Sequence, residues 1–113
     1  MADHVLSKDL GRAGWPADVD PILTIEPGTG ETIAFEVSDE AYAQMEQFRD
    51  LSKLTAVLNP VTGPVYVVGA EPGDTLVVHI HDIQLADFGW SVYLPGSGAL
   101  AGPMGEEWLV RRM

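Results

Sequence analysis

The chain has 113 residues, a formal charge of −11, 46% hydrophobic residues and no cysteine. A chain of this length forms one domain at most, with one modest core, and its hydrophobic content excludes wholesale disorder. The acidic balance repels phosphate backbones and anionic lipids, so we expect neither nucleic acid nor a membrane surface as a partner. Without cysteine, disulfides, thiol nucleophiles and zinc fingers are excluded.

The N-terminal segment lacks a basic region followed by an apolar run, and no stretch of about 18 apolar residues occurs. We therefore expect a soluble protein that has no standard export signal. The absence of cysteine is compatible with a cytoplasmic location.

Glycines and prolines divide the chain into short segments rich in β-branched and aromatic residues, which is typical of a mainly-β fold. In one segment, Ile33, Phe35 and Val37 alternate with more polar residues, which predicts a half-buried face. Strands are predicted over residues 22–26, 32–37, 65–68, 76–83, 89–94 and 107–111. This number of strands favours a sandwich or a partly closed barrel.

One segment departs from this pattern, because residues 38–54 contain neither glycine nor proline. Ser38 is a suitable helix cap, and Tyr42, Met45 and Phe48 recur at helical spacing. The pattern predicts one short helix over residues 40–51.

A tight turn is predicted between two of the strands. Pro72 presets the first backbone angle of a type II turn, and Gly73 supplies the positive φ that the next position requires.

His79 and His81 lie two residues apart in the predicted strand 76–83, so both point to the same face. This geometry can hold a divalent metal, but it needs a third ligand, and no spacing places His4, Asp39, Asp82 or Asp87 nearby. We favour the alternative, in which both histidines lie on the solvated face while Leu76, Val78 and Ile80 face the core. No metal site is therefore expected in this chain.

Other candidate sites are weaker. The serines lack a nucleophile elbow, and the glycines of residues 96–105 do not open a helix as a phosphate loop does. Asp39 could act as a base, although its place beside Ser38 also suits the start of a helix. Trp15, Trp90 and Trp108 are expected to be core or interface anchors.

A longer run is more specific: Asn59-Pro-Val-Thr-Gly-Pro-Val-Tyr-Val-Val-Gly-Ala-Glu-Pro-Gly-Asp-Thr-Leu-Val-Val78. This run resembles the N-terminal signature of the acetamidase/formamidase family, metal-associated amidohydrolases that cleave small amides to a carboxylate and ammonia. Residues 21–28, 33–39 and 83–100 also resemble family features. The resemblance thus covers the chain from about Pro21 to Leu100.

The resemblance implies a β-sandwich, jelly-roll-like region that forms the N-terminal part of a longer enzyme. The whole chain, residues 1–113, is then one β domain, and the later family motifs of the Gly-Asp-x-His type have no counterpart here. By analogy with the family, Asp39, Asn59 and Thr62 are expected to line a pocket that the missing half completes. The resemblance also implies a divalent metal in full-length members.

Two hypotheses from different classes follow. In the first, the chain is an N-terminal fragment or subunit of an amidohydrolase acting on acetamide or formamide, inactive alone, and its partner is the missing C-terminal half or a homo-oligomer. In the second, it is a non-catalytic β-sandwich that binds a small ligand or a protein.

Overall fold

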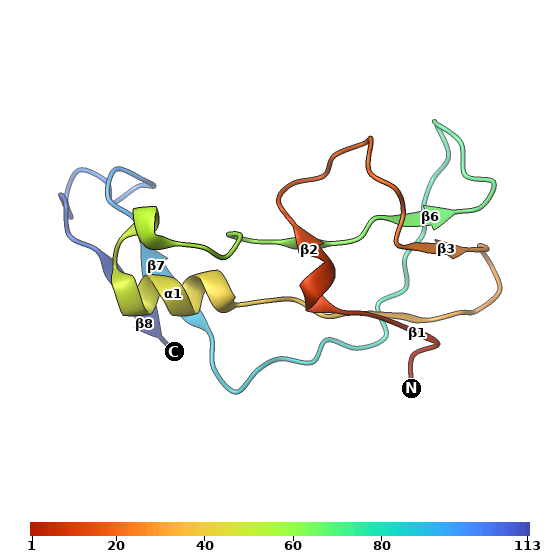
Figure 1. Cartoon of the computed structure of the whole chain (residues 1–113), viewed down its shortest axis with the longest axis horizontal. Coiled ribbons are helices and arrows are strands. Elements are labelled where there is room, and N and C mark those ends of the chain that lie inside the picture. The colour runs from red at the N-terminus through yellow and green to blue at the C-terminus, as the bar shows by residue number, and fades with distance from the viewer. The chain divides into compact units, whose positions relative to one another are not determined.

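The computed structural model describes all 113 residues, which form two compact units (Figure 1). Unit 1 comprises Met1–Asp39 and Val57–Val78, and unit 2 comprises Glu40–Ala56 and His79–Met113. We describe each unit by itself.

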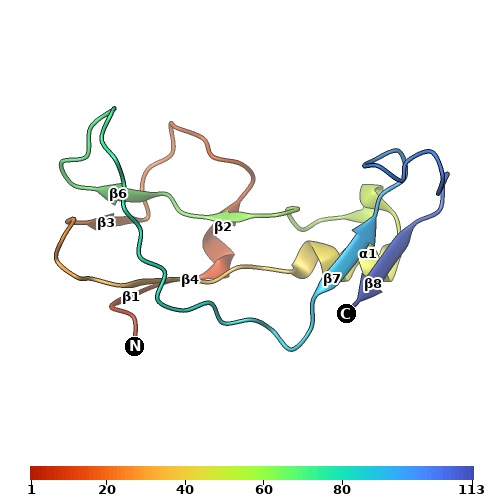
Figure 2. The ribbon, with the colours of Figure 1, turned by 180° about the vertical axis from the view of Figure 1, so that it is seen from behind.

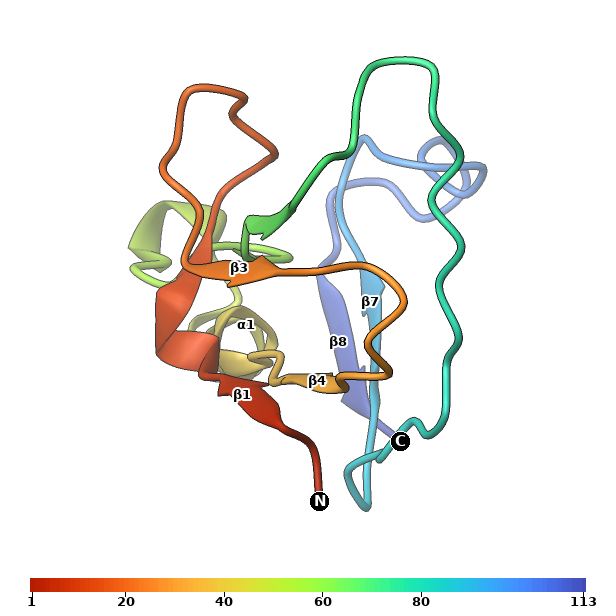
Figure 3. The ribbon, with the colours of Figure 1, turned by 90° about the vertical axis from the view of Figure 1, so that its right-hand side faces the viewer.

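Unit 1 consists of three short ladders, each made of two strands. Strand β1 (His4–Leu6) pairs in parallel with β4 (Ile33–Phe35), as Figure 3 shows. After a 3-10 turn, η1 (Lys8–Leu10), the chain enters β2 (Gly11–Arg12), which pairs antiparallel with β5 (Val61–Thr62). The third ladder joins β3 (Leu23–Ile25) and β6 (Val65–Val67) in parallel.

Asp3 fixes the start of the first ladder. Its carboxylate accepts hydrogen bonds from the backbone N–H of Thr32, at 2.8 Å, and from the Thr32 hydroxyl, at 2.9 Å. These bonds lower the pKa of Asp3 below its usual value, with the backbone bond from Thr32 as the largest cause. The carboxylate therefore holds β1 in register beside β4.

Unit 2 contains the helix α1 (Glu40–Phe48), the 3-10 turn η2 (Leu51–Lys53) and one antiparallel ladder of β7 (Trp90–Tyr93) with β8 (Leu109–Arg112) (Figure 2). The helix ends three residues before the predicted end because Arg49 adopts a positive φ of 50°, which stops α-helical bonding. Asp50 then caps η2 by accepting a hydrogen bond from the backbone N–H of Ser52 at 3.0 Å.

Most of the buried apolar side chains lie in unit 2. Ala41 and Met45, one helical turn apart, are buried on α1, and Met45 is fully buried. Tyr93 and Val110 are buried on the β7–β8 ladder, whereas unit 1 buries one large side chain, Leu6. The core of unit 1 is therefore very small.

The strand pairing confirms a mainly-β chain with one short helix. Predicted strands over residues 22–26, 32–37, 65–68, 89–94 and 107–111 correspond to β3, β4, β6, β7 and β8. The turn at Pro72 and Gly73 is also confirmed, because the Asp74 N–H donates to the Glu71 carbonyl at 3.0 Å and Gly73 has a φ of 101°. Each ladder joins only two strands, so the jelly-roll sandwich stays a prediction.

Two predictions were wrong. Residues 76–83 form no strand, because no other segment of the chain pairs with them, and Leu76, Val78 and Ile80 are exposed instead of facing a core. Phe35 and Val37 are also exposed, at 50% and 76%, since little of unit 1 covers that face of β4.

No helix of the structure is both long enough and apolar enough to cross a membrane.

Candidate functional site

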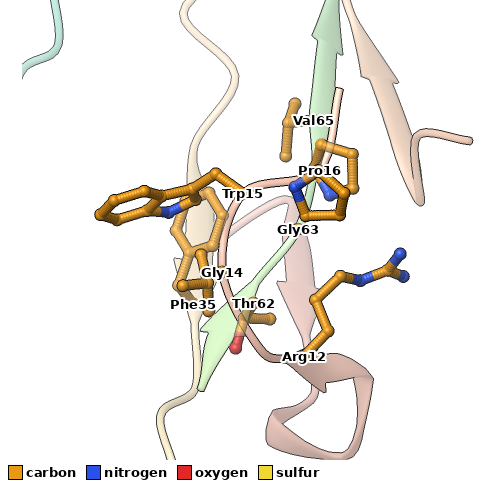
Figure 4. Close-up of a pocket in the computed structure, with 10 residues that line it drawn as sticks. Arg12, Gly14, Trp15, Pro16, Phe35, Thr62, Gly63 and Val65 are labelled. Carbon is orange, nitrogen blue, oxygen red and sulfur yellow. The ribbon is translucent and has the colours of Figure 1, made fainter. Parts of the chain in front are cut away.

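A small cavity lies within unit 1, where the β2–β5 ladder meets the loop that follows β2 (Figure 4). Its volume is about 190 Å³. The lining comes from three segments distant in sequence: Arg12, Gly14, Trp15, Pro16, Phe35, Val61, Thr62, Gly63, Pro64 and Val65. Half of these residues belong to the block that carries the family resemblance.

The ladder that builds this cavity depends on a close approach of two backbones. Gly11 pairs with Thr62, and a Cβ at position 11 would lie 3.0 Å from the Lys8 carbonyl oxygen and 3.1 Å from the Pro60 Cβ. A side chain at position 11 would therefore displace its neighbours by a few tenths of an ångström, which favours glycine where β2 approaches β5. The Thr62 hydroxyl donates to the Glu36 carbonyl at 2.8 Å, which ties β5 to the end of the β4 segment.

The walls of the cavity differ in chemistry. Trp15 and Phe35 lie together on one side, and Arg12 extends on the other (Figure 4). Both aromatic side chains are exposed, Trp15 at 87% and Phe35 at 50%. Exposed aromatic rings around a concavity can bury the apolar part of a small ligand.

Arg12 supplies the only charge among the lining residues. Its Nε atom is buried and makes no hydrogen bond. A buried donor without a partner is costly, and a guanidinium offers five N–H groups that suit carbonyl and carboxylate oxygens. The cavity therefore suits a small ligand that has an acceptor oxygen and a short apolar part.

Of the three residues expected to line a pocket, the structure places Thr62 in the wall of this cavity. Asp39 is exposed immediately before α1, and Asn59 is exposed with a φ of 51°; neither lines the cavity. The roles assigned to these three residues stay predictions.

Sequence reasoning did not find Arg12 and Phe35 and gave Trp15 a core or interface role. The pairing of β2 with β5 brings Arg12 into the site across almost 50 residues of sequence, and no local motif signals such a pairing. The exposure of Trp15 does not fit a buried core role.

His79 and His81 are exposed and lie outside any strand, in the extended segment between β6 and β7. No group of three or more His, Cys, Asp and Glu side chains in the structure has the arrangement of a metal site. The divalent metal implied by the resemblance therefore does not fit the residues present.

The fold and site define a mainly-β protein with a small cavity lined by the Thr62–Val65 block. A family model described as the Acetamidase/Formamidase family matches residues 3–102. The chain belongs to this family of amidohydrolases, which confirms the resemblance found in the sequence. A search among curated proteins finds no match.

Proposed function

We propose that this chain is the N-terminal part, or a subunit, of an amidohydrolase that cleaves small linear amides such as acetamide and formamide to a carboxylate and ammonia. The observation that carries the proposal is the family match over residues 3–102. In this proposal the chain is inactive alone and acts in the cytoplasm, where a cysteine-free sequence is at no disadvantage.

The size and chemistry of the cavity support a small amide as the ligand. A volume of about 190 Å³ is below the roughly 300–1,000 Å³ typical of pockets for larger ligands. Arg12 offers N–H donors to the amide oxygen, and the Trp15 and Phe35 rings offer apolar contact to a methyl group. Thr62 forms part of the cavity wall, where its hydroxyl is held by the bond to the Glu36 carbonyl.

Hydrolysis of an unactivated amide also needs an activated water and donors to the tetrahedral oxyanion. Arg12 is suited to the second task. The lining includes no Asp, Glu or His side chain to act as general base, so the proposal assigns water activation to further polypeptide. Because the residues present do not fit a metal, no step of the proposal passes through one.

The limited core also supports a need for further polypeptide. Unit 1 contains the whole cavity yet buries only Leu6 among its large apolar side chains. A domain that functions alone normally surrounds its ligand site with a packed core, which fixes the site geometry.

The proposal is tested by measuring ammonia release from acetamide and formamide by the purified chain, with and without Zn²⁺. We expect no release above background from the chain alone, and release when a companion chain carrying His- and Asp-rich motifs is added. Robust turnover by the chain alone would show that the active site lies within these 113 residues. A companion that binds without producing any activity would favour the non-catalytic binding module.

Ligand binding is tested separately by titrating acetamide into the chain and following amide NMR shifts. We expect shifts centred on residues 61–65, weakened about tenfold or more in Arg12→Met by loss of a charge-assisted bond. Arg111→Met is the matched control, because it removes the same charge from an exposed position on β8. Equal binding by both variants would contradict the assignment of the cavity.

A further inference from the structure

The Arg12 side chain is unpaired in the most acidic part of the chain. Most of the Asp and Glu residues belong to unit 1, whose only Lys and Arg residues are Lys8 and Arg12. Nevertheless, neither of the two ion pairs of the structure includes Arg12, and its buried Nε has no hydrogen-bond partner. A partly buried guanidinium loses hydration, and within the chain no carboxylate compensates for that loss. The guanidinium is therefore open to an anion from outside the chain.

The two aromatic rings of the cavity are also without partners. The ring-to-ring contact of the structure joins Phe88 and Trp90, so neither Trp15 nor Phe35 stacks on another ring of the chain. Both lie on one side of the cavity, and Arg12 lies on the other (Figure 4). An aromatic ring of a ligand can make the stacked or edge-to-face contacts that both rings lack.

The size of the cavity fits such a ring. An apolar protein cavity of roughly 150 Å³ holds one molecule of benzene. The cavity of unit 1 has a volume of about 190 Å³, which leaves room for one further small group beside a ring. A ligand as small as acetamide or acetate leaves much of this volume unfilled, and its methyl group cannot reach the whole apolar wall.

Charge indicates what the further group is. Arg12 supplies the only charge of the lining, and a carboxylate has two acceptor oxygens that match two N–H donors of a guanidinium. Phosphate or sulfate carries more charge than one guanidinium neutralises, and the acidic residues of unit 1 repel an anion in proportion to its charge. Salt screens that repulsion beyond about 8 Å, whereas direct contact with Arg12 is screened much less. An anion with a single charge is therefore favoured.

We propose that the cavity of unit 1 binds an aromatic monocarboxylate of the size of benzoate, with the carboxylate on Arg12 and the ring against Trp15 and Phe35. The proposal rests on the cavity that the proposed function assigns to the amide, and it adds regulation of that site, because such a carboxylate competes with the amide. A neutral amide accepts from the same donors without charge assistance, so it binds less tightly than the carboxylate of the same shape.

The test uses four ligands that separate charge from size: acetamide, acetate, benzamide and benzoate. Each is titrated into the purified chain, and dissociation constants are taken from the backbone amide NMR shifts of residues 61–65. We expect benzoate to bind about tenfold or more tightly than benzamide, which measures the effect of the charge. We also expect it to bind about tenfold or more tightly than acetate, which measures the effect of the ring. Benzoate should displace acetamide in a competition titration.

Three variants assign these two effects to their residues. Arg12→Met should abolish the difference between benzoate and benzamide, and Arg12→Lys should keep part of it, because lysine retains the charge but not the fork of donors. Phe35→Leu should reduce the difference between benzoate and acetate while leaving the preference for a carboxylate, because it removes a ring and keeps an apolar side chain. Arg111→Met is the control, since it removes a charge from an exposed position on β8.

The outcomes distinguish this proposal from the proposed function. No binding of benzoate, equal binding of benzoate and benzamide, or a preference for benzoate that survives Arg12→Met would overturn the carboxylate site. Acetate that binds as tightly as benzoate would overturn the assignment of the ring to Trp15 and Phe35. Ammonia release is not measured in these titrations. Benzoate binding therefore supports the site even where no companion chain produces ammonia, and ammonia release without benzoate binding supports the proposed function alone.

Discussion

The turn at residues 71–74, which follows β6, allows a quantitative test of the local structure. Gly73 has a φ of 101°, and a Cβ at this position would meet no atom within 4 Å. The substitution Gly73→Ala therefore introduces no clash, and its cost comes from backbone strain alone. A left-handed backbone costs an L residue about 1–3 kcal/mol, and the lower entropy of the unfolded alanine chain offsets about 0.4–1 kcal/mol.

The net expectation is a destabilisation of about 1–2 kcal/mol, which moves a urea midpoint by roughly 0.5–1 M for a slope near 2 kcal/mol/M. Gly102→Ala is the matched control, because position 102 is equally open but has no positive φ. It should leave the midpoint unchanged or raise it slightly. Equal midpoints for Gly73→Ala and the natural chain would refute the argument from backbone strain.

Three further predictions concern packing, pH and metal. Met45→Ala should cost about 2–5 kcal/mol in urea denaturation, because it empties the fully buried position on α1. Asp3→Asn should lower the urea midpoint at pH 7. Because the pKa of Asp3 is lower in the folded state, its contribution to stability is present above about pH 4 and disappears as the pH falls through the folded pKa. The urea midpoints of Asp3→Asn and of the natural chain should therefore converge at low pH. Replacing His79 and His81 with alanine should change neither zinc content, measured by elemental analysis, nor the thermal midpoint; stoichiometric zinc lost in the double variant would contradict this.

Local chemistry was sufficient to predict several elements. The α1 helix follows from the spacing of Tyr42, Met45 and Phe48, and the structure confirms that Met45 is fully buried on this helix. The turn at Pro72 and Gly73 follows from the φ preferences of two adjacent residues. In both cases the determining interactions lie within a few residues of one another, which a single sequence can reveal.

Pairing between distant segments could not be predicted. β1, β2 and β5 are only two or three residues long, and each depends on a partner nearly 30 to 50 residues away. The cavity depends on the same pairing, because Arg12 reaches Thr62 only through the β2–β5 ladder. The family resemblance pointed to Thr62, whereas the places of Arg12, Trp15 and Phe35 in the cavity lining could be identified only from the structure.

The segment of residues 76–83 shows why a correct local pattern can still give a wrong prediction. Its alternation of Leu76, Val78 and Ile80 satisfies every local criterion for a strand, yet a strand exists only when another backbone completes its hydrogen bonds. Within these 113 residues no segment does so, and side chains that the pattern assigns to a core are at least 68% exposed.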